Sequence, residues 1–140
     1  MRKFLIALPL IAAVPLLAQE SAPQPVPGAA DPARIAAGSY AVDPNHTQIN
    51  WQVNHFGFND YFGLFGEVTG TLQIDPANPA AAKVDVTIPI SSIATSSAGL
   101  TGHLKTPDFF DQAKFETARF VSTSVNVDGQ RATIRGDLTM

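Results

Sequence analysis

Apolar and polar residues alternate along most of the chain from residue 39 onward. In residues 48–55, every second side chain is Ile, Trp, Val or His, and the others are Gln or Asn. A period of two places successive side chains on opposite faces of a β-strand, so such a strand buries one face only. We predict six strands, located near Tyr40 and over residues 48–55, 67–75, 83–90, 115–127 and 132–140.

The segments between these strands carry turn and helix signals. Asp128-Gly129 predicts a tight type I′ hairpin, because both central positions of that turn need positive φ. Before it, Val121, Thr123, Val125 and Val127 are assigned to one face by their spacing.

Residues 91–111 interrupt the alternation. Residues 100–110 predict one or two short helical turns, with Thr106 as an N-cap followed by Pro107. Short strands joined by turns predict an all-β protein, either a sandwich or an antiparallel barrel, with a short helical insertion.

The first 38 residues lack this alternation. A cationic Met-Arg-Lys start precedes an apolar run over residues 4–18, which is shorter than the roughly 20 residues of a membrane-spanning helix and contains two prolines. We expect a cleaved signal peptide over residues 1–18, a Pro/Ala-rich linker without a fold of its own over 19–38, and one domain over 39–140. The protein is therefore expected to be exported, with no stable membrane anchor.

Charge and composition exclude some partners. Loss of the two basic residues in the leader moves the net charge from −3 to about −5. An acidic protein repels phosphates, so neither nucleic acid nor an anionic membrane surface is an expected partner. The exported chain has no cysteine, so its stability has to come from packing rather than disulfides.

The three histidines are the first candidates for chemistry. His46, His55 and His103 show no His-x-x-x-His spacing, so no metal site is predicted. His55 shares its strand face with Trp51, which predicts a hydrogen-bonded core histidine. Asp43 and His46 predict a turn that is cross-linked by their side chains.

A catalytic serine is the second candidate. A Ser-His-Asp triad can be drawn from Ser91 or Ser92, His103 and Asp108, but no Gly-x-Ser-x-Gly elbow is present to expose the serine. We therefore expect no enzyme activity. The glycines between residues 63 and 70 are assigned to a loop and a strand, where glycine often marks a bulge or bend.

Aromatic residues form two groups in the sequence, one over residues 51–65 and one over residues 109–120. In a barrel of about eight strands, the interior is just wide enough for side chains or one small ligand. The aromatic groups are therefore core residues, pocket residues or both.

Several segments of this sequence resemble the YceI family of exported lipid- or polyisoprenoid-binding proteins. They are Tyr-Ala-Val-Asp-Pro-Asn-His-Thr at 40–47, Val-Asn-His-Phe-Gly at 53–57, Gly-Leu-Phe-Gly at 63–66, His-Leu-Lys-Thr-Pro-Asp-Phe-Phe-Asp at 103–111 and Gly-Asp-Leu-Thr at 136–139. One departure is Leu-Thr-Gly at 100–102, where the family commonly has an Arg-Asp pair.

The resemblance implies a lipocalin-like antiparallel β-barrel in the periplasm that holds an amphiphilic lipid, such as an isoprenoid quinone or prenyl phosphate, and no other cofactor. Family members continue past the Gly-Asp-Leu-Thr segment into further strands. Because a ligand-holding barrel needs about eight strands, we expect the barrel to be incomplete in this chain and the natural chain to extend past Met140. A homodimer is consistent with the sequence.

Our leading hypothesis is an exported lipid carrier or sequestering protein. The alternation of side chains between the two faces of each strand assigns these residues to the pocket lining: Ile49, Trp51, Val53, Phe65, Val68, Leu72, Val84, Val86 and Ile88. Ser92, Thr95 and His103 are expected to hold a polar head group near the mouth. The alternative is a periplasmic structural or interaction module whose core the same residues fill, and an enzyme ranks third.

Overall fold

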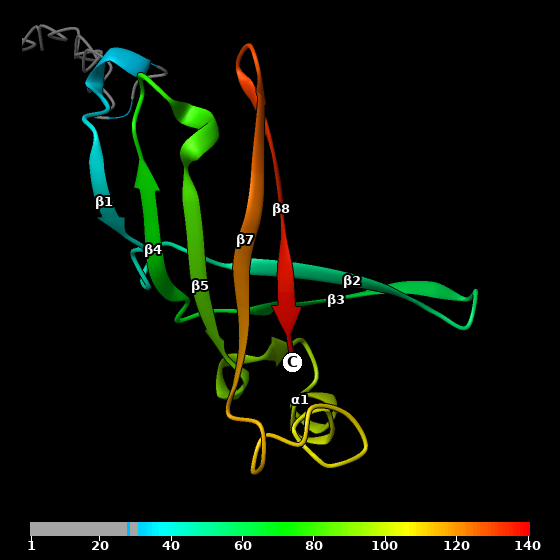
Figure 1. Cartoon of the computed structure of the whole chain (residues 1–140). Helices are drawn as coiled ribbons and strands as arrows, with labels where there is room; N and C mark the ends of the chain where they lie inside the picture. The colour runs from blue at the N-terminus through cyan, green and yellow to red at the C-terminus, as the bar shows by residue number, and fades with distance from the viewer. Residues whose placement is uncertain (1–27, 29–30) are drawn as a thin grey trace, which may run out of the picture. The chain divides into compact units, whose positions relative to one another are not determined.

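A computed structural model describes residue 28 and residues 31–140, and antiparallel strands dominate that part of the chain (Figure 1). Its strands are β1 (Gly38–Ala41), β2 (Ile49–His55), β3 (Asn59–Phe65), β4 (Thr69–Ile74), β5 (Lys83–Pro89), β6 (Ala94–Thr95), β7 (Thr117–Asp128) and β8 (Arg131–Thr139). The helix is α1 (Ala98–Leu104), and short 3-10 turns occupy Pro32–Arg34, Pro79–Ala81 and Ile90–Ser92. The predicted all-β antiparallel class with a short helical insertion is confirmed.

The predicted signal peptide lies outside the described residues, as does most of the predicted linker. The described end of that linker contains the 3-10 turn Pro32–Arg34 and the first residue of β1, Gly38. Tyr40 on β1 donates its hydroxyl hydrogen to the Ala36 carbonyl at 2.7 Å. No helix among the described residues has both the length and the apolar character that a bilayer crossing requires.

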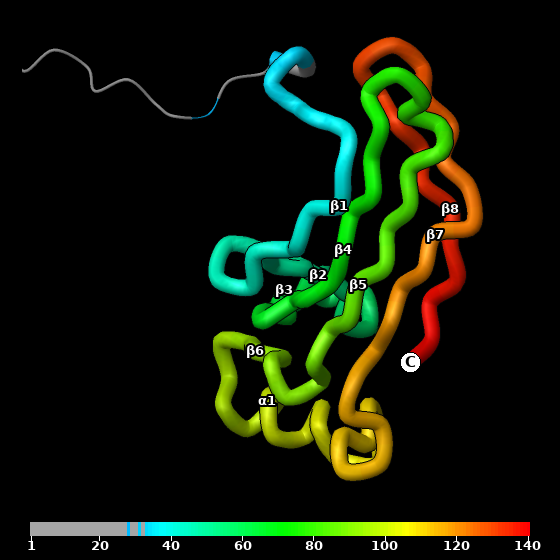
Figure 2. The backbone as a smooth tube through the Cα atoms, turned by 60° about the vertical axis from the view of Figure 1, so that its left-hand side comes forward, coloured from blue at the N-terminus to red at the C-terminus, as the bar shows by residue number. Residues whose placement is uncertain are grey.

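The strands of residues 31–140 form two sheets. The larger sheet has the order β1-β4-β5-β7-β8, and the smaller has the order β2-β3-β6. Figure 2 shows the five strands of the larger sheet running side by side, with β6 and α1 beyond one end of them. No described strand joins the edge of one sheet to the edge of the other, so the barrel is not closed within this part of the chain.

Two of these strands were absent from the prediction. Residues 59–65, assigned to a glycine-containing loop, form β3 and pair with β2 over its whole length. Both faces of β3 carry aromatic side chains, Tyr61 on one and Phe62 on the other, so the sequence shows no apolar-polar alternation there. The two-residue strand β6 is too short to produce any period.

The β7–β8 hairpin is confirmed, but two details of its prediction are wrong. The register shifts between Ser122 and Ser124, and this β-bulge puts Val121 and Val125 on opposite faces instead of one. Asp128 still pairs with Arg131, so the turn consists of Gly129 and Gln130, of which Gly129 alone has positive φ, at 56°. A type I′ turn would need both.

The helical insertion begins earlier than predicted. Ser97 caps α1 by accepting a hydrogen bond from the Leu100 amide at 3.3 Å, and α1 ends at Leu104. Thr106 is therefore not an N-cap: it follows the helix and donates its hydroxyl hydrogen to the His103 carbonyl at 2.8 Å. Residues 96–99 contain no apolar period, so the sequence pattern gives no signal for a helix that begins here.

The buried core lies where the two sheets and the helical segment meet. Its members are Phe65, Val68, Ile88, Ile90, Ile93, Leu104 and Ala118. Fully burying a side chain such as Ile90 contributes about 1.5–3 kcal/mol to stability. This core packs α1 against β3 and β5, and thereby positions the walls of the cavity described below.

Candidate functional site

An apolar cavity of about 560 Å³ lies between the β2–β3 hairpin and the segment containing α1 and the turn that follows it. Its lining residues are Trp51, Val53, His55, Phe56, Asn59, Tyr61, Phe65, Leu100, Leu104, Phe109 and Phe110. None of these carries a formal charge when histidine is neutral. The volume falls in the range of about 300–1,000 Å³ that is typical of small-molecule sites.

The register of the hairpin builds one wall of the cavity. Val53 pairs with Tyr61, and His55 pairs with Asn59. Because side chains two residues apart share a face, the lining residues of β2 and β3 project from the same side of the smaller sheet. Val53 is 52% exposed, so this wall is open to solvent along part of its length.

Trp51 lies on this wall over Gly63, its partner on β3. A Cβ atom at Gly63 would lie 2.0 Å from Trp51 Cζ2 and 2.4 Å from Cε2, so only glycine leaves room for the indole. Trp51 Nε1 is buried and has no hydrogen-bond acceptor among the described residues. A buried donor without a partner is rare and costs stability.

The second wall comes from α1. Leu100 and Leu104 lie one helical turn apart and both line the cavity. The start of α1 is tied to β6, because the Thr95 amide donates to Thr101 Oγ1 at 3.0 Å and Thr95 Oγ1 donates to the Ser97 carbonyl at 2.9 Å. These bonds hold the helix beside the edge strand of the smaller sheet.

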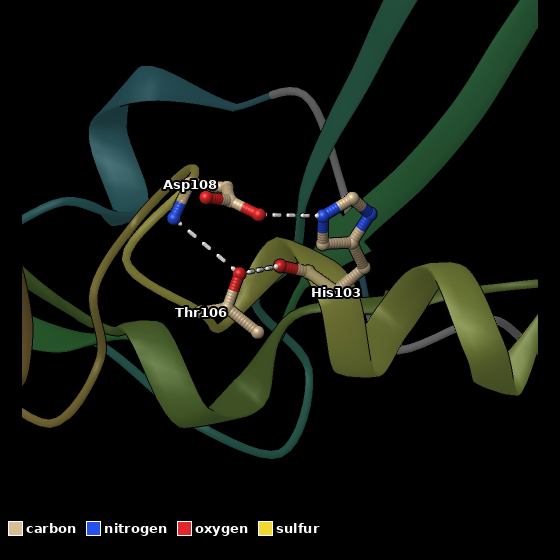
Figure 3. Close-up of polar contacts among 3 residues, drawn as sticks. All are labelled: His103, Thr106 and Asp108. Carbon is tan, nitrogen blue, oxygen red and sulfur yellow. Dashed lines mark hydrogen bonds and ion pairs between the residues drawn. The ribbon is translucent and has the colours of Figure 1, made fainter.

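The turn after α1 supplies the remaining aromatic residues, and a polar cluster holds it (Figure 3). His103 Nε2 lies 3.0 Å from Asp108 Oδ2, and Thr106 Oγ1 accepts from the Asp108 amide at 3.4 Å. His103 also contacts the edge of the Phe109 ring, with 5.0 Å between ring centroids. Phe110 meets the core residue Phe65 edge to face at 5.7 Å.

The strongest electrostatic features lie away from the cavity. A hydrogen bond from His46 lowers the pKa of Asp43, with a further contribution from the Asn45 amide. A hydrogen bond from Arg119 lowers the pKa of Asp85, and the same pair raises the pKa of Arg119. None of these groups lines the cavity: Asp43 and His46 stabilise a local turn, and Asp85 and Arg119 join the neighbouring strands β5 and β7.

Three residues of the predicted pocket line the cavity: Trp51, Val53 and Phe65. Ile49, opposite Phe65 on the same sheet, packs against the core instead. The other five lie on or beside the larger sheet and do not line this cavity: Val68, Leu72, Val84, Val86 and Ile88. Val68 and Ile88 belong to the buried core.

The three residues expected at a polar mouth are dispersed. Ser92 Oγ donates to the Pro89 carbonyl at 2.7 Å, and Thr95 lines a separate hollow of about 300 Å³. His103 reaches the cavity only through its contact with Phe109. Neither serine of the drawn triad has a hydrogen bond to His103 among the described residues, although the His103–Asp108 pair is formed.

His55 differs from its prediction. It is exposed rather than a core residue, and it lies at the rim of the cavity, where its ring contacts Phe56 with 4.8 Å between centroids. The turn predicted from Asp43 and His46 is confirmed, with Asp43 Oδ2 2.6 Å from His46 Nδ1. Within residues 31–140, no three His, Asp or Glu side chains converge as a metal site would require.

Most of the lining residues lie outside the predicted pocket. His55 ends the predicted strand β2, Phe56 lies in the turn after it, Asn59 and Tyr61 belong to the missed strand β3, and Leu100, Leu104, Phe109 and Phe110 belong to the helical segment and the turn after it. The signal was present in the two aromatic groups of the sequence. Their convergence depends on the β2–β3 pairing, which the sequence pattern did not reveal.

Comparison with known proteins assigns the fold to a family. A family model described as a YceI-like domain matches residues 40–140. The chain belongs to the YceI family. Its YceI relative from Escherichia coli O157:H7 is 41% identical over 106 residues, which cover 74% of this chain and 56% of the relative. The YceI protein of Salmonella arizonae is 38% identical over the same shares of the two chains.

Solved structures of YceI-like proteins agree with this assignment. The Campylobacter jejuni YceI protein is 29% identical, with a TM-score of 0.54 over 72% of this chain and 60% of that one. BcnA of Burkholderia cenocepacia has a TM-score of 0.59 at 21% identity over 79% and 62% of the two chains, and supports the fold alone. The chain spans about half the length of the curated YceI relatives it matches.

Proposed function

We propose that this YceI-family protein is an exported, periplasmic carrier or sequestering protein that binds a long-chain isoprenoid or other lipid in the cavity beside β2 and β3. The observation that carries the proposal is the lining of the cavity, which is almost entirely aromatic and aliphatic and contains no carboxylate, ammonium or guanidinium group. An isoprenoid quinone and a prenyl phosphate each have a long apolar tail that such a lining accepts.

The apolar tail supplies the binding energy in this proposal. Each methylene group transferred from water to an apolar wall contributes about 0.8 kcal/mol, so several isoprene units need no charged contact. The tail lies against Phe65 and Leu104, which belong to the buried core. A carrier binds and releases its ligand unchanged, so no covalent step is required of the protein.

The polar head lies at the opposite end. His55 and Asn59 face each other across the hairpin and are polar members of the lining. Their nitrogen and oxygen atoms can donate to or accept from a carbonyl, hydroxyl or phosphate oxygen. The ligand is therefore oriented with its head at the hairpin tip and its tail toward α1.

Trp51 provides a direct test, because it is the sole tryptophan of the chain and lines the cavity. A brominated long-chain fatty acid is titrated into the protein in the absence of vesicles, and tryptophan fluorescence is recorded. Saturable quenching with one acid per chain supports the proposal. The absence of quenching by this acid and by a short-chain isoprenoid quinone contradicts it, and favours a module that binds protein partners.

A charge on the cavity wall should weaken this binding. Val53→Asp places a carboxylate among apolar side chains, where an apolar tail cannot solvate it, and should weaken binding at least about tenfold. Gln52→Asp is the matched control, since it adds the same charge to the next residue of β2 on the opposite face. Equal affinities for the two variants would contradict the assignment of the cavity.

A further inference from the structure

The two phenylalanines of the turn after α1 are anchored differently. Phe109 and Phe110 both line the cavity. Phe110 packs against the core, where its ring meets Phe65 edge to face at 5.7 Å between centroids. Phe109 is not part of that core cluster. Within residues 31–140, the one aromatic ring that contacts it is His103, at 5.0 Å and an angle of 88°. The place of Phe109 in the cavity wall therefore rests on its contact with His103.

His103 is also tied to the residue before Phe109. Its Nε2 lies 3.0 Å from Asp108 Oδ2 (Figure 3), and because an ionised carboxylate can only accept, Nε2 donates. Thr106 Oγ1 donates to the His103 carbonyl and accepts from the Asp108 amide. The Phe109 amide donates to the Thr106 carbonyl at 3.1 Å. These bonds join residues no more than five positions apart, so the cluster belongs to its own segment and does not depend on closure of the barrel.

The charge of the imidazole sets the strength of this link. A neutral imidazole carries its hydrogen on one nitrogen only, whereas an imidazolium donates from both. A hydrogen bond becomes shorter and stronger when both partners are charged. Histidine is the side chain that ordinarily changes charge between about pH 5 and pH 8. The link should therefore be strongest at the acid end of that range, and should weaken as pH rises through it.

The other ionisable groups around α1 and the cavity are placed differently. Lys105 donates its ammonium hydrogen to the Ser91 carbonyl at 2.7 Å, outside the His103 cluster. Neither β6 nor the 3-10 turn that contains Ser91 has an ionisable side chain. On the opposite wall, Tyr61 ionises far above this pH range, and Asp60 lies on the other face of β3. Among the described lining residues, His55 is then the group that titrates in the same range.

We propose that His103, acting through Asp108, positions Phe109 in the cavity wall, and that protonation of His103 tightens ligand binding. A wall that is already held in its bound arrangement loses less conformational freedom when the ligand enters. The affinity then rises without any new contact to the ligand. His103 does not itself line the cavity, so it is a positioning residue. This inference rests on the proposed function, because it concerns control of the same cavity.

A short-chain isoprenoid quinone measures the effect, because its own charge does not change in this pH range. The quinone is titrated into the full chain at about pH 5.5 and about pH 8, and quenching of Trp51 reports binding. The affinity should be about two- to fivefold higher at the lower pH. That range is the one expected of an ion pair whose partners are both solvent-exposed.

Two variants remove the ion pair. His103→Gln and Asp108→Asn should each abolish the pH dependence, and should bind at the lower pH as the original protein binds at the higher. Asp111→Asn is the matched control, since it removes a carboxylate from the same turn but leaves the pair of His103 and Asp108 intact. It should keep the pH dependence. A merely structural role of His103 would lower the affinity at both pH values and preserve the difference.

The position of Phe109 can also be followed without ligand. Magnetic resonance spectra of protein with isotope-labelled phenylalanine rings are recorded over the same pH range, and Phe109→Leu identifies the Phe109 signal. That signal should shift with pH in the original protein and stay fixed in His103→Gln. The signal of Phe110 should change little in either protein, because its ring packs against the core.

The outcomes separate this inference from the proposed function. Equal quinone affinities at the two pH values, or a pH dependence that His103→Gln retains, overturn the positioning role and leave the carrier proposal standing. Retention in His103→Gln with loss in His55→Gln would assign the effect to His55 instead. A Phe109 signal that is insensitive to pH also overturns the positioning role. If neither the quinone nor the brominated acid quenches Trp51 while the Phe109 signal follows His103, the carrier proposal alone is overturned.

Discussion

At the scale of single residues, the pair formed by Trp51 and Gly63 decides the shape of the cavity. Gly63→Ala should displace the indole, because the new methyl group would lie 2.0 Å from Trp51 Cζ2. Overpacking of this kind costs about 1–3 kcal/mol of the free energy of unfolding. Urea unfolding measures this loss, and the Trp51 emission maximum should shift because the ring moves.

Gly66→Ala is the control for that substitution. A Cβ atom at Gly66 has no neighbour within 4 Å, so this variant should keep the stability and the emission spectrum of the original protein. If Gly63→Ala is as stable as Gly66→Ala, the indole does not lie against the β3 backbone in solution. The cavity wall would then differ from the one described above.

At the scale of elements, the N-cap of α1 should make a measurable contribution to the free energy of unfolding. Ser97→Ala removes the acceptor for the Leu100 amide, and the loss of a serine N-cap costs about 1 kcal/mol. Ligand affinity should fall with stability, because α1 carries Leu100 and Leu104 of the cavity lining. Ser96→Ala is the control, since within residues 31–140 the one contact of Ser96 Oγ is a long one, 3.5 Å from the Tyr61 hydroxyl.

The elements that could be predicted are those whose two faces differ. β2 and β5 have one apolar face each, and both were predicted to within a residue or two. β3 has aromatic side chains on both faces, and the extra residue in the β7 bulge reverses the apparent period. Periodicity reports burial of one face, so it fails where both faces are apolar or where the ladder is irregular.

The candidate site was only partly predictable for a related reason. Parity correctly groups Trp51 with Val53 on one strand, but it does not show which strands lie opposite each other. The prediction therefore included Leu72 and Val84, which pair with each other in the larger sheet. Leu100 and Phe110 contribute to the cavity through a helix and a turn, where alternation carries no information.

At the scale of the whole described unit, the cavity lies at the one place where both sheets and the helix contribute to a common core. Phe65 and Leu104 belong to both the core and the cavity lining. Under the proposed function, a bound apolar tail would extend this core instead of occupying a separate site. Ligand binding should then raise the stability of the folded state through mass action.

The same unit should lose stability in acid through an ion pair that lies outside the cavity. The Arg119 guanidinium donates two hydrogen bonds to Asp85 and lowers the pKa of that carboxyl below its ordinary value. A lowered folded-state pKa contributes stability above the unfolded pKa, and that contribution disappears as pH falls through the lowered value. As pH falls below the unfolded pKa of about 4, the unfolded state binds the proton first, and below the lowered folded value both states bind it and the pair is lost.

Asp85→Asn tests this account of acid sensitivity. The difference in the free energy of unfolding between the original protein and Asp85→Asn should be constant from neutral pH to about pH 5, and should shrink toward zero as pH falls further. The difference should be small throughout, and smaller in high salt, because both partners are solvent-exposed. Glu116→Gln is the control, since Glu116 has no side-chain partner among the described residues. A difference that grows on acidification would mean that Asp85 and Arg119 are not paired in solution.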